Sequence, residues 1–554
     1  MKRKVFVLVM LLIQLNKTYA HIGNSNITLE GMAGPYHVLV NIKPPDVIPG
    51  TASLTVYTSG AGIKITARPV YFYSGEGGAP LPDILDAVAG NPGQYSGALW
   101  LMNNGSASIE IGLSGPKGKG KILVPVVAVS ITKKSLPPFT RYMLIALGVF
   151  LFVLMATISG ASVSDAVTKS GEPISAKSKY AKGAAIIITA LLCSGLVLGG
   201  KRWWNSIEKK TSRYIFKPMH ASYTVENNKG NVLNLTIDTA GSQRSKWLPY
   251  IIPDHGKIMH LFLVSLPGME VFAHIHPART GSLGFSVDMP DIPNGKYLAF
   301  ADIVYNSGFT ETLKDTLTIN NDTTGFKTDS AGDSDNSSDI SHPISFAGNV
   351  GNEGKNVTIG GKTGQVYNTG DGLKILLEAP EKGRHYFSGG LQQFKFSLWD
   401  ENNQPFVPDL YMGMAGHLMI IRYDGNVFSH VHPVGTYSMA AQMRLENRMA
   451  TTGGKPENPD AAAFRDSVDI AVKKLEAMPE KEREDYLMME MAGMEMPAGC
   501  GPEEKKTMMG MLNMHTGNTV SFPYTFESPG NYRIWVQVKK NGRVYTGVFD
   551  RAVK

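Results

Sequence analysis

The sequence predicts a mainly β protein of three β-sandwich domains, with a two-helix transmembrane hairpin and a helical, Met-rich insertion. Runs of β-branched and aromatic residues alternate with Gly, Pro and Asn turns along most of the 554 residues, which include 59 glycines and 32 prolines. Two charge-free apolar runs interrupt this pattern. Two histidine-bearing segments, Asp254–Pro277 and Ala415–Pro433, resemble each other closely enough to indicate an internal repeat.

Residues 1–20 have the pattern of a secretory signal peptide. Lys2, Arg3 and Lys4 precede a short apolar run, and small residues occupy the expected cleavage positions before His21. Cleavage after residue 20 would make His21 the mature N-terminus, where a terminal amine and an imidazole could chelate copper as a histidine brace. The alternatives are an uncleaved anchor and a His21 without a function.

Residues 21–135 are expected to form the first, exported β-sandwich domain. The runs TASLTVYT, IKITARPVYFY, SASIEIGLSG and GKILVPVVAVSITK supply its strands, and Gly, Pro and Asn residues supply the turns between them. A seven-stranded sandwich of about 100 residues fits this length.

Residues 142–160 and 183–200 are predicted to be transmembrane helices joined by a cytoplasmic loop at 161–182. The charge-free runs Met143–Gly160 and Gly183–Gly200 approach the ~20 residues needed to cross a bilayer. The alternative is a pair of buried core helices. Together with the signal peptide, the hairpin places the protein in the inner (cytoplasmic) membrane, with its β domains in the periplasm.

Two further β-sandwich domains are expected at 214–320 and 344–554, joined by a flexible, Asp/Ser/Gly-rich linker at 321–343. Each carries one of the two histidine segments. The strands GKYLAFADIVY and NYRIWVQVKK follow at matching positions, which extends the repeat. The last domain also holds a Met-rich insertion at 434–515, part of which, Asp460–Glu490, has a helical composition.

The repeated segments are predicted to bind metal ions. In the second, Asp424-Gly425 indicates a two-residue type I′ hairpin turn, which sets His417 opposite His432 and puts His430 on the same sheet face. The equivalent histidines of the first segment converge only if the loop around Pro267-Gly268 has an odd length. The predicted ligand sets are one ion at His417, His430 and His432 and another at His260, His274 and His276, with His255 as an additional ligand. The alternative is a group of ordinary core histidines held by hydrogen bonds.

The opposite face of each hairpin is expected to belong to a sandwich core. Leu261, Phe262 and Leu263 are assigned to that face in the first segment.

Methionines favour copper over zinc at these sites. Three imidazoles suit either metal, whereas a thioether is a soft ligand that suits Cu(I). Met412 and Met414 precede His417, and the insertion adds a Met-rich stretch that includes Met491 and Met494. The alternative is that these methionines are flexible packing residues. The predicted cofactor is therefore copper, with zinc as the second choice.

Several function classes lack support in the sequence. No nucleophile, phosphate-binding or H-E-x-x-H motif occurs, so no catalytic residue is assigned and a non-enzymatic function is expected. The formal charge of +7 is small, and the Lys and Arg residues are scattered, so nucleic-acid binding is not expected. The expected partners are a metal ion, the lipid bilayer and another exported metal-handling or membrane protein.

The motifs DHGKIMHLFLV…FAHIHP and GHLMII…FSHVHP, each followed by a PG-Y-x-aromatic strand, resemble YtkA-like and related immunoglobulin-like domains of exported bacterial proteins. Such domains often accompany copper-handling systems. The resemblance covers roughly 214–320 and 385–554, and it implies immunoglobulin-like sandwiches with the histidines as candidate ligands. Residues 21–160 resemble the N-terminal half of bacterial membrane proteins.

The sequence therefore predicts a membrane-anchored periplasmic metal-binding protein that binds copper for tolerance or delivery. Two alternatives stay open. One is a non-enzymatic structural or interaction protein that displays immunoglobulin-like domains. The other is a copper enzyme that uses His21 as a brace.

Overall fold

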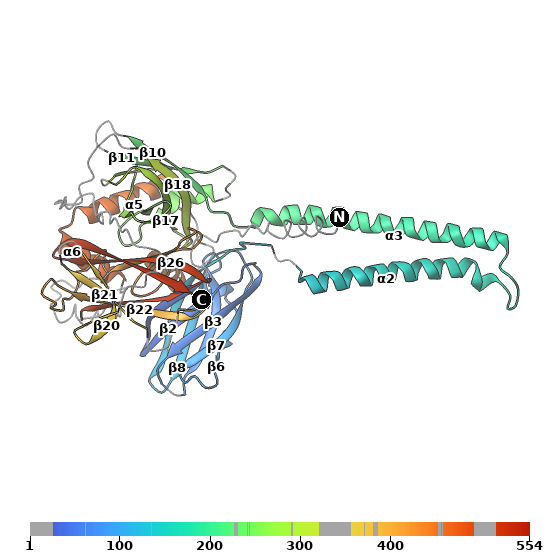
Figure 1. The fold of residues 1–554 in the computed structure, drawn as a ribbon, viewed down its shortest axis with the longest axis horizontal. Helices are drawn as coiled ribbons and strands as arrows, with labels where there is room; N and C mark the ends of the chain where they lie inside the picture. Colours follow the sequence, from blue (N-terminus) through green and yellow to red (C-terminus); the bar gives the residue numbers. More distant parts are fainter. Residues whose placement is uncertain are drawn as a thin grey trace. The chain divides into compact units, whose positions relative to one another are not determined.

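The computed structural model describes residues 26–491 and 517–554, apart from 321–355 and short stretches at 61, 134–135, 227–230, 241, 243, 290–291, 370–371, 381–385, 452–455 and 457. The described chain is mainly β, and all pairs of its named strands are antiparallel (Figure 1). It divides into two compact units, one formed by residues 129–217 and the other by the rest of the chain. The predicted signal peptide, His21 and the predicted linker at 321–343 lie outside the described residues.

The N-terminal β region has two sheets, and strands such as β2 and β3 alternate buried residues with more exposed ones. In β2 (Tyr36–Lys43) the buried residues are Tyr36, Val38, Val40 and Ile42, as expected for a strand with one face on a core. The first sheet has the order β1 (Ile27–Ala33), β2, β3 (Gly50–Thr58), β7 (Gln94–Leu101), β6 (Asp86–Ala87). The second has the order β5 (Asp83–Ile84), β4 (Lys64–Tyr71), β8 (Gly105–Gly115), β9 (Gly118–Ala128).

The middle β region, residues 218–320, also forms two sheets. One has the order β10 (His220–Glu226), β11 (Val232–Asp238), β16 (Gly284–Asp288), β15 (Ala278–Arg279). The other has the order β12 (Ile251–Ile252), β17 (Gly295–Tyr305), β13 (His260–Ser265), β14 (Phe272–Ile275), with β18 (Thr310–Ile319) paired to β17.

The C-terminal β region, residues 356–554, repeats this plan and adds three helices between β24 and β25. One sheet has the order β19 (Val357–Ile359), β20 (Lys362–Asn368), β21 (Lys374–Glu378), β22 (Leu391–Trp399), β25 (Thr519–Thr525). The other has the order β24 (Phe428–Val431), β23 (His417–Arg422), β26 (Gly530–Lys540), β27 (Arg543–Val553). The helices are α4 (Met439–Ala450), α5 (Ala461–Glu476) and α6 (Glu480–Met491).

The middle and C-terminal regions share an apolar cluster between their histidine-bearing sheets. Within it, Phe300 stacks on Phe428 with ring centroids 4.3 Å apart, and Phe272 stacks on Trp535 at 5.1 Å. Its buried members are Phe262, Val264, Met269, Phe272, Leu298 and Phe300 of the middle region and Met419, Ile421, Phe428, Trp535 and Val548 of the C-terminal region. These strands are therefore covered on both faces, which explains why runs such as HLFLV and HLMII lack a polar alternation.

The assignment of Phe262 to a sandwich core was wrong. Phe262 pairs with His274 and shares its sheet face, which points to the neighbouring region, whereas Leu261 and Leu263 occupy the opposite face. The apolar face and the histidine face of each hairpin are thus one continuous face, apolar near the turn and imidazole-bearing at the other end.

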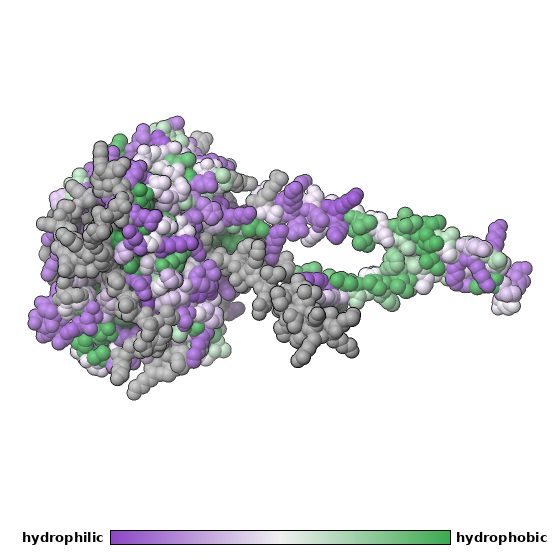
Figure 2. Space-filling view, turned by 45° about the horizontal axis from the view of Figure 1, so that its top comes forward, coloured by the Kyte–Doolittle hydropathy of each residue, from purple (hydrophilic) through white to green (hydrophobic). Residues whose placement is uncertain are grey.

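The second compact unit holds two long apolar helices, α2 (Pro138–Val163) and α3 (Ala176–Thr211), which contact each other. Figure 2 shows hydrophobic residues on the surface of both helices, next to hydrophilic residues. The helical segments Pro138–Val167 and Ala176–Thr211 have mean hydropathies of 2.4 and 2.1 over their most apolar windows, which are almost entirely exposed. These helices are therefore long and apolar enough to cross a membrane, and they are not buried core helices of the described structure.

Candidate metal centre

Both histidine hairpins have the register that makes their histidines converge. In the second hairpin, Leu418 pairs with Val431, so His417 and His432 stand opposite each other at the strand ends. In the first, Leu261 pairs with Ile275, which sets His260 opposite His276 across the five-residue loop 266–270. The odd loop length that convergence requires is therefore present.

The predicted type I′ turn at Asp424-Gly425 was wrong. A type I′ turn needs positive φ at both central residues, but of these two only Gly425 has one, at 68°. The Arg422 N–H donates to the Val427 carbonyl, which closes a four-residue loop instead. The longer loop keeps the same pairing, because it adds one residue on each side of the turn.

A type I′ turn lies shortly before each hairpin, and the two turns occupy equivalent positions in the repeat. Asp254 and Lys257 exchange backbone hydrogen bonds around His255 (φ 51°) and Gly256. Tyr411 and Met414 do the same around Met412 (φ 53°) and Gly413. His255 in the first half of the repeat and Met412 in the second half therefore occupy equivalent positions.

The first group of imidazoles comprises His260, His274 and His276, as predicted, and one ligand nitrogen from each lies within 4.8 Å of the others. His260 Nδ1 is 3.1 Å from His274 Nε2, and His276 Nε2 is 3.2 Å from the same atom. Metal–nitrogen bonds of 2.0–2.1 Å in a tetrahedral site separate the ligand atoms by about 3.3 Å. The spacing of these nitrogens therefore matches that of a three-histidine metal site.

Hydrogen bonds from the outer nitrogens determine the tautomers of two members of this group. His260 donates from Nε2 to the Asp254 carbonyl at 3.1 Å, and His274 donates from Nδ1 to Gln537 Oε1 at 2.9 Å. In the neutral rings, His260 Nδ1 and His274 Nε2 then both carry lone pairs, and they face each other. Two facing lone pairs repel each other, and a shared cation removes this repulsion. Outer-shell acceptors of this kind are typical of metal-binding histidines.

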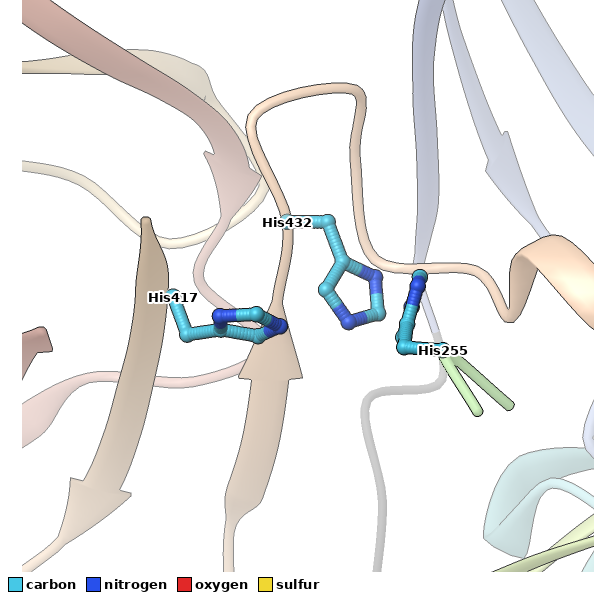
Figure 3. A group of neighbouring side chains, drawn as sticks. All are labelled: His255, His417 and His432. Carbon is cyan, nitrogen blue, oxygen red and sulfur yellow. The ribbon is translucent and has the colours of Figure 1, made fainter. Parts of the chain in front are cut away.

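The second group comprises His255, His417 and His432, rather than the predicted set of His417, His430 and His432. Figure 3 shows the three rings converging, with His432 between the other two. The His432 ring centroid lies 4.6 Å from that of His255 and 5.4 Å from that of His417. His255 therefore does not add to the first group as expected. It crosses to the C-terminal region because the Asp254–Lys257 turn lies against that region's histidines.

Several nitrogens of the second group make no hydrogen bond to any described residue. His432 donates from Nδ1 to the Tyr437 carbonyl at 3.2 Å, so that its Nε2 carries the lone pair. That Nε2 atom and both ring nitrogens of His255 and His417 are buried without a hydrogen-bond partner in the described part of the chain. Each such orphaned group costs about 1–3 kcal/mol. One nitrogen of each ring lies within 4.8 Å of the others, so three of these atoms could bind one shared cation.

Burial keeps these imidazoles neutral, which is the form that binds metals. It lowers the pKa of His255 and of His432 from 6.5 to about 3. It also lowers the pKa of His274 and His417 well below the ordinary histidine value. The histidines are therefore available as ligands throughout the physiological pH range.

His430 belongs to neither group, although it was predicted as a ligand. Its Nδ1 lies 3.5 Å from Asp302 Oδ2, and burial raises the pKa of that carboxyl group to about 7. Asp302 stands opposite His260 on β17, and Gln537 stands opposite His417 on β26. Asp302 of the middle region therefore lies next to His430 of the C-terminal region, and Gln537 of the C-terminal region binds His274 of the middle region. Sequence analysis missed both residues, although their matching positions in the aligned strands could have indicated them.

The predicted methionine ligands have different outcomes. Met412 and Met414 are buried, at 2% and 1% exposure, in the turn before His417. Met419 pairs with His430 and shares its sheet face. Met491 ends α6, but its side chain lies outside the described part of the structure, and so does Met494.

The helical insertion covers the centre. The Ala440 N–H at the start of α4 donates to Asp254 Oδ1 at 3.0 Å, and the Gly413 N–H donates to Glu484 of α6. A side chain at Gly256 would contact Leu475 of α5 and Leu487 of α6. The helices therefore close the site over the two type I′ turns, and they help to exclude water from it.

The loop that follows His432 is held by the N-terminal region. The Glu30 N–H donates to the Val434 carbonyl at 2.8 Å, and the Thr436 N–H donates to the Thr28 carbonyl at 3.0 Å. A Cβ at Gly435 would lie 2.0 Å from the Thr28 carbonyl oxygen, so only glycine fits there. All three β regions thus contribute to the position of His432.

We expect Gln537→Met to lower metal affinity 10–100-fold, because it removes the acceptor that orients His274 while it keeps the volume of the side chain. Gln537→Glu, which retains an acceptor, is the matched control and should keep its affinity. Competition titrations against a chromophoric chelator would measure both. Equal affinity of Gln537→Met and the wild type would contradict this role.

Comparisons with known proteins add no functional assignment. No protein-family model matches the chain, and no curated protein does so significantly. A tetra-tandem repeat from the extending region of a large adhesion protein shares 8% identity over 92% of this chain and 72% of its own, at a TM-score of 0.15. Dimeric latent PorU from Porphyromonas gingivalis shares 6% sequence identity over 96% of this chain and 34% of its own, at a TM-score of 0.13. The BSP domain of a biofilm-associated protein shares 8% sequence identity over 99% of this chain and 69% of its own, at a TM-score of 0.13. Similarities this low support no inference.

Proposed function

We propose that this protein is a membrane-anchored metal-binding protein whose histidine centre binds copper outside the cytoplasm, for tolerance or delivery. One observation carries the proposal. His260 and His274 each donate a hydrogen bond from one nitrogen and direct the other toward a common point, 3.1 Å apart. A core histidine pair would be expected to place a donor against an acceptor, whereas a metal site needs lone pairs that converge.

Copper is favoured over zinc because the turn before His417 and the strand that carries it also carry buried methionines. Met412 occupies the position in the repeat that His255 occupies in the other half, and Met419 shares a sheet face with His430. Imidazole and thioether ligands together suit Cu(I), whereas zinc sites rarely use a thioether ligand. A neutral thioether also needs no deprotonation.

The membrane and export parts of the proposal rest on separate features. The two apolar helices support an anchor in the inner membrane. The signal-like N-terminus supports a periplasmic position for the β regions, which we regard as immunoglobulin-like sandwiches. Since the centre has no assigned catalytic residue, we propose binding rather than catalysis, with a further exported protein as the source or recipient of the metal.

The test is metal loading of the full-length protein in detergent. The C-terminal region alone is unsuitable, because it lacks His255. We expect the purified protein to retain Cu(I) after gel filtration, and to prefer Cu(I) to Zn(II) in competition. His220→Ala is the matched control, since that side chain is 72% exposed and pairs with Asp315 away from the centre. A wild-type protein that retains neither metal would overturn the proposal and would favour a structural or interaction role.

A further inference from the structure

The two groups of imidazoles adjoin each other within one continuous cluster. The ring centroids of His255 and His260 are 6.2 Å apart, and those of His274 and His417 are also 6.2 Å apart. Each of these pairs joins one member of the first group to one member of the second. The ligands of one group are therefore direct neighbours of the ligands of the other.

His430 occupies the space between the groups. Its ring centroid is 5.2 Å from that of His260 in the first group and 4.5 Å from that of His432 in the second. Its Nε2 is buried and has no hydrogen-bond partner among the described residues. A seventh imidazole thus offers a lone pair between two complete three-histidine sets.

The internal repeat gives both sets the same construction. Each hairpin contributes a pair of opposed histidines, and each neighbouring long strand sends one polar side chain across the interface. Gln537 accepts from His274, and Asp302 faces His430 at 3.5 Å. Two related half-sites that meet face to face are expected to bind two ions rather than one.

Carboxyl groups lie on both sides of the cluster. Asp254 Oδ1 is 3.6 Å from His255 Nε2, and Asp302 Oδ2 is 3.5 Å from His430 Nδ1. Two cations held close together in a buried site repel each other, and nearby carboxylates offset this repulsion. The seven imidazoles alone could not provide this compensation.

From these contacts we infer that the protein holds a dinuclear copper centre, with one ion at His260, His274 and His276, a second at His255, His417 and His432, and His430 between them. This inference rests on the proposed function. The second ion joins the middle region to the C-terminal region, because its three ligands come from both.

The test combines metal content with electron paramagnetic resonance of the full-length, Cu(II)-loaded protein. We expect two copper ions per chain and a spectrum broadened by coupling between them. His276→Ala and His255→Ala each remove one ligand of a single set, so each should retain one ion with the sharp signal of an isolated Cu(II). The matched control, His220→Ala, should keep two coupled ions.

The outcomes separate this inference from the proposed function. Wild-type protein that binds one ion, or two ions with additive uncoupled signals, would overturn the dinuclear centre and leave copper binding intact. Protein that binds no copper would overturn both. The wild-type measurement decides the question even when a variant fails to fold.

Discussion

Replacing His274 with alanine is expected to abolish binding at the first three-histidine set. His274 Nε2 is the atom that lies within 3.2 Å of both other ligand nitrogens, so its loss removes the central ligand of this set. The loss of affinity should exceed the 10–100-fold typical of an outer-shell change. The ring also stacks on Phe262 with centroids 4.3 Å apart, so the cavity should lower the free energy of unfolding by about 2–4 kcal/mol.

The variant His274→Phe separates these two effects. Phenylalanine can keep the stacking on Phe262, but it offers no ligand atom. We expect it to lose the metal as completely as His274→Ala, with a smaller loss of stability in chemical denaturation. Retention of a full complement of copper by either variant would show that His274 is a packing residue.

The second large effect is a loss of folding stability at acid pH. The folded-state pKa values of His255 and His432 are about 3, below the unfolded value of 6.5, so the unfolded chain binds more protons between these limits. Stability is therefore fully present above pH 6.5 and falls as the pH falls toward 3. The slope is about 1.4 kcal/mol per pH unit for each histidine. Between pH 6.5 and pH 5 these two residues should cost the apoprotein about 3 kcal/mol.

The same depressed pKa values predict how the metal leaves. Because the folded ligands stay neutral at pH 5, protons compete poorly for them until the chain unfolds. Metal release and loss of β structure should therefore occur at the same pH, as measured with a metal indicator and circular dichroism. Exposed histidine ligands would instead release the ion near pH 6.5 from a folded protein, and that result would contradict a buried site.

The register of the second hairpin was predictable from the sequence, but the loop length of the first hairpin and the division of ligands between the two sets were not. The spacing of His417, His430 and His432 along two adjacent strands places them on one sheet face, because side chains alternate with a period of two. Whether His255 turns toward its own hairpin or the other depends on how two sheets pack, and local spacing carries no information about that.

The sequence of the histidine-bearing strands also indicates how they pack. The runs HLFLV and HLMII have no polar alternation, which indicates strands covered on both faces. Phe262, Phe300 and Phe428 accordingly join two β regions instead of filling one. The helices at 461–476 and 480–491 agree with their predicted composition, whereas their position over the metal centre follows only from tertiary contacts such as that of Gly413 with Glu484.

X-ray absorption spectroscopy of the copper-loaded, full-length protein tests the central claim most directly. We expect about three imidazole nitrogens per copper at about 2.0 Å, with the outer-shell scattering of histidine rings. His220→Ala should give the same spectrum. Copper bound by oxygen or sulfur ligands without imidazole scattering would place the metal elsewhere in the chain and contradict the histidine centre.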